Sequence, residues 1–157
     1  MPGLELKFSI EGETQLIRRL RDVERDFKDW TKEFIKVGDL LLKTFKENFR
    51  TQGQTLGERW KALTPQTMSQ KKRLGYPLVP LIRTGTMRDS FKSNPSRYEV
   101  VISNPTPYFV FHQSRKTRHK LPRRVMMKID ERRKQLIGKV FQKSIEDILQ
   151  KRQFKGA

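Results

Sequence analysis

The most heavily charged part of the chain is residues 114–124, which we call the basic loop and which carry six basic side chains and no acidic one. Such a segment can neutralise phosphate groups without reading base sequence. It lacks the interleaved aromatic side chains that stack the bases of single strands. The cations could equally face an acidic surface of a neighbouring protein, or stay solvated. The candidate contact residues are Arg115, Lys116, Arg118, Lys120, Arg123 and Arg124.

Catalytic chemistry has few candidates in this sequence. The absence of cysteine excludes disulfides, thiolate nucleophiles and thiolate metal sites. Two histidines, His112 and His119, are too few for a histidine metal site. A catalytic histidine also needs a nucleophile and an orienting carboxylate, and residues 100–129 contain no Asp or Glu. We therefore expect no enzymatic activity and no cofactor.

A nuclease with a carboxylate-bound metal is the enzyme class that this sequence could still accommodate. Its candidate ligands after residue 50 are few and lie far apart in the chain: Glu58, Asp89 and Glu99. This separation disfavours a nuclease, and we expect no metal site.

Two motifs have both a structural and a binding interpretation. Gly85 lies between two threonines, Thr84 and Thr86, at the start of a helical pattern, where backbone amides can bind anions. A phosphate-binding loop would need more glycines and a lysine at fixed spacing. We therefore interpret Gly85 as a residue needed for the backbone conformation and not for ligand binding. Trp60 and Leu63 are expected to pack over the edge of a sheet and to anchor a long loop.

Composition indicates one domain that relies on long helices or on partners. The chain has 157 residues, and its apolar fraction of 34% is low for a self-sufficient globule. The charge is uneven, because residues 1–50 carry 11 Lys/Arg and 10 Asp/Glu, whereas residues 51–157 carry 24 and 7. The second part therefore predicts an acidic partner, either nucleic acid or an acidic protein face.

The sequence shows no sign of membrane insertion or export. No apolar run approaches the ~20 residues that span a bilayer. The N-terminal residues lack the basic segment followed by an apolar one that marks a signal peptide. We therefore expect a protein that is made and folded in a cytoplasm and that does not contact a membrane.

Hydrophobic periodicity predicts a strand and then a long helix in the first third of the chain. Alternating apolar side chains predict the strand over residues 4–10. The helix is expected over about residues 14–50, because apolar residues from Leu16 to Leu41 recur at alternating steps of four and three. Gly38 has the lowest helix propensity in this stretch and is the expected site of a bend.

The middle of the chain, residues 51–97, is punctuated by glycine and proline and is expected to be rich in loops. One or two helical turns are predicted over residues 67–73. A short helix is predicted over residues 84–91, capped by one of its two threonines, with Met87 and Phe91 facing inward.

The last third predicts a small sheet and a second long helix. Residues 98–112 are expected to form strands, with residues 108–112 as either a second extended segment or a short helix. The final helix is expected to start at about residue 125 or 130 and to end at residue 152, followed by a flexible tail, residues 153–157. The predicted fold class is α+β, in which a small antiparallel sheet packs against two long helices within a single domain, residues 1–152.

Several short motifs follow one another in a fixed order between about residues 45 and 150. They comprise Trp60, Leu63, Thr64, Thr67, Lys71 or Lys72, Leu81, Ile82, Thr84, Gly85, Met87, Ser90, Tyr108, His112, Gln113, Leu121, Pro122 and Arg124. This ordered set resembles the phage virion morphogenesis family, whose members are called tail-completion proteins in tailed bacteriophages. The chain departs from the family pattern after His112-Gln113, where Ser114-Arg115-Lys116 stands in place of glycine-rich residues. We therefore expect the basic loop to be particular to this protein.

The resemblance implies a structural virion protein without enzymatic activity. It implies a ring, commonly of six copies, at the head–tail junction, in contact with neighbouring neck, connector and tail proteins. In such a ring the basic loop would line the lumen, near double-stranded DNA, or would lie on a face between rings. A free nucleic-acid-binding protein and a terminator ring that caps the tail tube are the alternatives.

Overall fold

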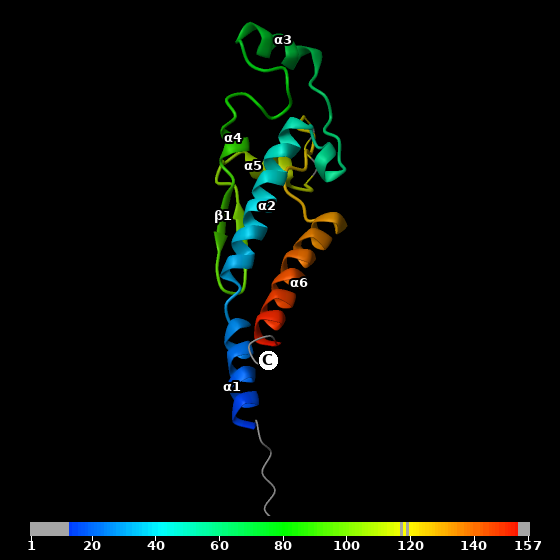
Figure 1. Ribbon diagram of the computed structural model, residues 1–157. Coiled ribbons are helices and arrows are strands. Elements are labelled where there is room, and N and C mark those ends of the chain that lie inside the picture. Colours follow the sequence, from blue (N-terminus) through cyan, green and yellow to red (C-terminus); the bar gives the residue numbers. More distant parts are fainter. Residues whose placement is uncertain (1–12, 117, 119, 154–157) are drawn as a thin grey trace, which may run out of the picture.

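The computed structural model describes residues 13–116, 118 and 120–153, which form an elongated α+β body (Figure 1). Helix α3 lies at one end of this body and helix α1 at the other, with α2 between them. The predicted α+β class is confirmed, with one small antiparallel sheet and several helices. The elements are α1 (Glu13–Asp26), α2 (Thr31–Arg50), η1 (Gln54–Leu56), α3 (Pro65–Arg73), α4 (Thr86–Asp89), β1 (Lys92–Pro95), β2 (Val100–Ser103), α5 (Phe109–Gln113) and α6 (Glu131–Gln153).

The prediction of one helix over residues 14–50 is wrong, because the chain breaks between α1 and α2. Helix α2 starts after Trp30, whose side chain makes no capping hydrogen bond. In the break before it, Asp29 accepts hydrogen bonds from the backbone amide and the hydroxyl of Thr31, at 2.9 and 2.6 Å. The apolar spacing continues across the break because α6 packs against both α1 and α2. The ring of Phe141 in α6 lies 5.4 Å from that of Trp30 and 5.2 Å from that of Phe34.

The expected bend at Gly38 is also wrong. Gly38 is buried in the continuous helix α2 and lies against the sheet. A Cβ atom at this position would overlap the Ser93 hydroxyl of β1 and would lie 3.4 Å from a methyl group of Val100 in β2. The glycine therefore permits close approach of helix and sheet rather than a change of direction.

The sheet consists of β1 and β2 in antiparallel pairing, from Lys92 opposite Ser103 to Pro95 opposite Val100. Strand β1 lies in the part of the chain that was predicted to be loops. The sequence did not predict this strand because residues 92–95 show no alternation of apolar residues. For the predicted strand segment, residues 98–112, the structure has β2 and then the helix α5, so the helical alternative for its last part is confirmed. The strand predicted over residues 4–10 lies outside the described residues.

The core follows the buried side of α2. Phe45 and Phe49 are fully buried, and their rings lie 5.6 and 6.1 Å from that of Phe91. The ring of Trp60 packs edge-on against that of Phe49 in α2, with 5.2 Å between the ring centres. Trp60 was predicted to cover the edge of a sheet, and it covers α2 instead. Met87 and Phe91 are buried, as the sequence predicted.

The second long helix, α6, begins later than residue 125. The Asp130 carboxylate accepts the Arg133 amide at 2.9 Å and marks the first turn. Figure 1 shows α6 running back along α2 toward α1. Its last turn contacts α1 through Arg152, which donates to Asp26 at 2.7 Å and to Asp22 at 3.2 Å. Residues 154–157 of the predicted tail lie outside the described residues.

We predict that Gly38→Val destabilises the protein by about 2 kcal/mol, because the new side chain must push α2 away from the sheet. Urea denaturation measures the change in the free energy of unfolding. Gly138→Val is the matched control, since a Cβ on this second helical glycine meets no atom within 4 Å. The control should stay within about 0.5 kcal/mol of the wild type. Equal effects of the two substitutions would contradict the close packing of Gly38.

Candidate functional site

The basic loop is held at its start by Gln113, the last residue of α5. The Gln113 side chain accepts the amides of Met126 and Met127 at 2.8 and 3.1 Å and donates to the Met127 carbonyl at 2.6 Å. The Arg124 amide also donates to the His112 carbonyl at 3.0 Å. The two ends of the loop are therefore tied to each other, so the loop leaves the protein from a closed base.

The end of the loop is tied to the core at the Val125 carbonyl. This buried oxygen accepts the Asn48 side-chain amide at 3.0 Å and the Trp60 indole N–H at 2.9 Å. Asn48 also accepts the Leu56 amide at 3.2 Å, so both ends of its side chain are paired. Asn48 was not predicted as a site residue from the sequence, although a polar residue between Phe45 and Phe49 in an apolar seam was a usable signal.

Arg124 differs from the other basic candidates because it is buried, with 7% of its surface exposed. Its guanidinium donates twice to the Lys61 carbonyl, at 3.2 and 2.9 Å. Burial lowers the pKa of this guanidinium. Among the described residues no carboxylate lies within 4.0 Å of it. Arg124 therefore supports the loop and leaves a buried positive charge without a counter-ion.

The remaining cations of the loop divide into held and exposed ones. Arg118 lies 4.9 Å from the centre of the Phe111 ring and donates to the Phe111 carbonyl at 2.9 Å. Arg123 lies 3.5 Å from Glu58. The others are exposed and have no ion-pair partner in the described part of the chain: Arg115, Lys116 and Lys120. Arg123 is also exposed but faces Glu58, so these three are the exposed loop cations that no ion pair in the described residues engages.

The residues that carry the family motif serve mainly as framework. Thr64 caps α3, since its hydroxyl accepts the Thr67 amide at 3.3 Å. Gly85 has φ +87°, a left-handed conformation that suits glycine, and directly precedes α4. The Thr84 hydroxyl lies 2.7 Å from that of Thr86. Leu63 and Pro122 are partly buried. The left-handed conformation of Gly85 agrees with the interpretation that this residue is needed for the backbone conformation.

A cavity of about 410 Å³ opens beside these framework residues. Its wall includes Leu63, Thr84 and Gly85 together with His112 and Arg124, so motif residues far apart in the sequence meet there. Burial and the nearby Arg124 lower the pKa of His112, and the Pro122 carbonyl partly opposes them. Since the described wall holds no Asp or Glu, no carboxylate orients this histidine.

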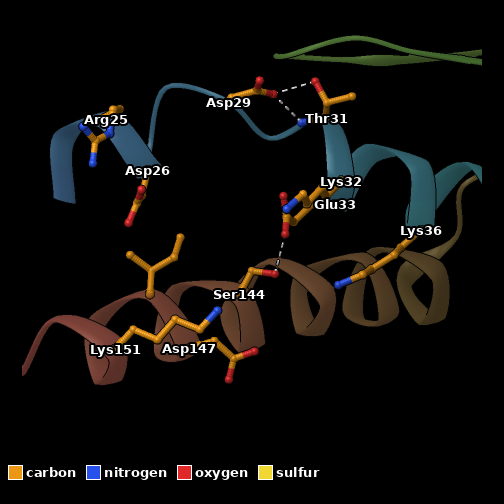
Figure 2. Close-up of a pocket in the computed structure, with 11 residues that line it drawn as sticks. Arg25, Asp26, Asp29, Thr31, Lys32, Glu33, Lys36, Ser144, Asp147 and Lys151 are labelled. Atoms are coloured by element: carbon orange, nitrogen blue, oxygen red, sulfur yellow. Dashed lines mark hydrogen bonds between the residues drawn. The ribbon is translucent and has the colours of Figure 1, made fainter. Parts of the chain in front are cut away.

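A second hollow, of about 680 Å³, lies where the break between α1 and α2 faces α6. Figure 2 shows the Glu33 carboxylate reaching across to the Ser144 hydroxyl, which donates to it at 2.7 Å. Lys36 and Lys151 also line the hollow. Both the α1–α2 side and the α6 side contribute acidic and basic side chains to the hollow. We therefore interpret it as a polar contact between helices.

The carboxylates considered for a nuclease do not gather in the structure. Glu58 binds Lys128 at 2.7 Å, and Asp89 binds the adjacent Arg88 at 2.7 Å. Within the described residues, no group of three or more His, Cys, Asp or Glu could hold a metal ion. The same part of the chain contains no helix long and apolar enough to cross a membrane.

The described residues thus present an anchored loop with exposed cations on a fold of packed helices and one small sheet. A model of the phage virion morphogenesis family matches residues 12–147 of the chain, which therefore belongs to this family. The resemblance seen in the sequence is thereby confirmed. No curated protein and no solved structure matches the chain. Family membership indicates a structural or assembly role in a bacteriophage and an association with the virion.

We predict that Gln113→Ala destabilises the protein by about 2–3 kcal/mol, because it leaves buried backbone groups of Met126 and Met127 unpaired. Their amides should also exchange hydrogen faster. Gln142→Ala is the control, since Gln142 is exposed and bonds only Glu146 in the next turn. It should change the free energy of unfolding by less than about 0.5 kcal/mol. Unchanged exchange at Met126 in the Gln113 variant would contradict the anchoring.

We also predict a contribution of His112 to the pH dependence of stability. Its folded-state pKa lies below the usual value of about 6.5, so the unfolded chain binds the proton more readily. This contribution is complete above about pH 6.5 and is lost as the pH falls toward the folded-state pKa. Between about pH 7.5 and 5.5, wild type should therefore lose more stability than His112→Asn, measured by urea denaturation. Equal losses would refute the shift.

Proposed function

We propose that this protein is a tail-completion or neck component of a tailed phage, made in the host cytoplasm and incorporated into the virion at the head–tail junction. In this proposal the copies form a ring, of six subunits, that contacts the adjacent connector and tail proteins. Double-stranded DNA passes through its lumen. The observation that carries the proposal is the anchored basic loop next to an exposed apolar helix, in a chain of the phage virion morphogenesis family.

The exposed apolar helix is α5. Its Val110 and Phe111 side chains are 56% and 48% exposed, although they belong to the most apolar segment before the basic loop. Aromatic side chains and arginine are enriched in protein interfaces. Phe111 and Arg118, stacked on each other at the surface, form such a pair. This surface suits contact with another protein subunit.

The elongated shape of the described residues also supports assembly. The buried apolar side chains form a narrow core along α2, and apolar residues such as Tyr98 and Val101 of the sheet region are exposed. An oligomer would bury part of this surface, as the low apolar content of the sequence also suggests.

DNA contact is supported by the three exposed cations of the basic loop, which have no ion-pair partner in the described part of the chain. Such residues can neutralise phosphates of any sequence. An acidic face of an adjacent ring would suit them equally well. A terminator ring on the tail tube and a free nucleic-acid-binding protein are the competing functions.

The proposal predicts a ring of about six copies in purified particles. Native mass spectrometry gives the copy number, and cryo-electron microscopy of virions gives the position. In a phage that lacks the gene, a plasmid-borne variant with Arg115, Lys116 and Lys120 changed to Gln should lower the infectious yield, because the loss of three contacts of about 0.5 kcal/mol each weakens binding about tenfold.

The matched control changes three exposed cations of α6, Arg132, Lys139 and Lys143, to Gln and removes the same charge. This control should complement normally. A monomer that is absent from particles and binds DNA with a steep salt dependence would overturn the ring in favour of a free nucleic-acid-binding protein. A ring that caps the tail tube of isolated tails would favour the terminator.

A further inference from the structure

The cavity of about 410 Å³ near α4 combines apolar and cationic walls. Leu81, Ile82 and Met87 supply apolar surface, whereas Lys71, Arg83 and Arg124 supply positive charge. The described wall includes no acidic side chain. Such a combination is unusual for a solvated surface. Several positive charges gather here without a negative one, although the apolar walls partly exclude the water that would stabilise them.

Two of these cations are committed to backbone carbonyl groups rather than to carboxylates. The buried Arg124 guanidinium donates to the Lys61 carbonyl, and the Lys71 ammonium donates to the Pro77 and Val79 carbonyls at 2.9 and 2.6 Å. Burial, then Arg124 and then Arg83 lower the pKa of Lys71. The carbonyl groups position the cations but do not neutralise them, so the pocket retains a positive potential.

His112 also lines this wall, but its unpaired Nδ1 atom is inaccessible to solvent. An atom that solvent does not reach offers no contact to a ligand in the cavity. The cations and the apolar side chains therefore define what the cavity can bind.

We propose that this cavity receives the carboxylate of an Asp or Glu side chain, flanked by apolar residues, from a partner protein. Arg83 and Arg124 would bind the carboxylate, and the apolar wall formed by Leu81, Ile82 and Met87 would hold the flanking side chains. The proposal does not depend on ring formation, on copy number or on a position in the neck.

The shape of the site favours a protein over DNA. Phosphates of a duplex lie on a convex, hydrated surface and are contacted by exposed cations, as on the basic loop. A buried guanidinium within apolar walls instead suits a single side chain that enters from outside, in the manner of an anchor residue at a protein interface. Arginine also matches the planar geometry of a carboxylate.

The test is a nuclear magnetic resonance titration of the full chain with an acetylated and amidated peptide, Ala-Leu-Glu-Leu-Ala. We expect saturable shifts of the Arg124 Nε–H signal and of the Thr84 and Gly85 amides. The same peptide with Gln in place of Glu should bind about tenfold more weakly, because it lacks the charge-assisted hydrogen bonds. Equal binding of the two peptides, or no binding of either, would overturn the proposal.

Protein variants separate the cavity from general attraction by a basic protein. Arg83→Gln removes an exposed cation of the cavity, and Arg124→Lys keeps the charge but loses the planar fork. Both should weaken binding of the Glu peptide by about tenfold or more. Arg132→Gln, on α6, removes one exposed charge outside the cavity and should leave the affinity unchanged. An equal loss in all three variants would show non-specific attraction and refute the site.

Two further titrations test the other occupants. A short DNA duplex should shift the signals of Arg115 and Lys116 but not those of the cavity residues. If the duplex shifts the cavity signals and the Glu peptide does not, the cavity binds phosphate. Dilution of the protein by itself should not move the Thr84 and Gly85 signals. If dilution moved them, the occupant would be a second copy of this chain, and a separate acidic partner would be excluded.

Discussion

The Val125 carbonyl is the point on which the rest of the structure depends. It accepts hydrogen bonds from Asn48 in α2 and from Trp60 after η1, at 3.0 and 2.9 Å. All three groups are buried, so each pairing replaces a bond to water that the unfolded chain would keep. Three segments distant in the sequence are thereby joined, and the core aromatic residues Phe49 and Trp60 can pack edge to face at 5.2 Å.

This connection decides which cations are available at the surface. Because residues 124–127 are held in the core, Arg124 turns inward and spends two donors on the Lys61 carbonyl. The exposed cations, Arg115, Lys116 and Lys120, project from a base that Gln113 closes. A fixed base reduces the conformational entropy that the loop would lose on binding a ligand.

The protein thus carries two cationic surfaces of different depth. The basic loop is exposed and polar, whereas the cavity at Arg83 and Arg124 has apolar walls. Exposed charges act over a distance and are weakened by salt, while a charge within a cavity acts at contact and selects by shape. The two surfaces therefore differ in the range and in the selectivity of the interactions that they can make.

Sequence alone determined the α+β class, the main helical segments and the burial of Met87 and Phe91, because apolar periodicity is a local property of the chain. It also located the basic loop and the family motif. Only the tertiary structure showed that the first helix breaks before α2, because α6 packs along both segments and the apolar spacing runs on without interruption. It also showed that residues 92–95 form a strand, because β2 pairs with them. The burial of Arg124 could likewise not be predicted from the sequence, since its hydrogen-bond partner, the Lys61 carbonyl, lies 63 residues away in the chain.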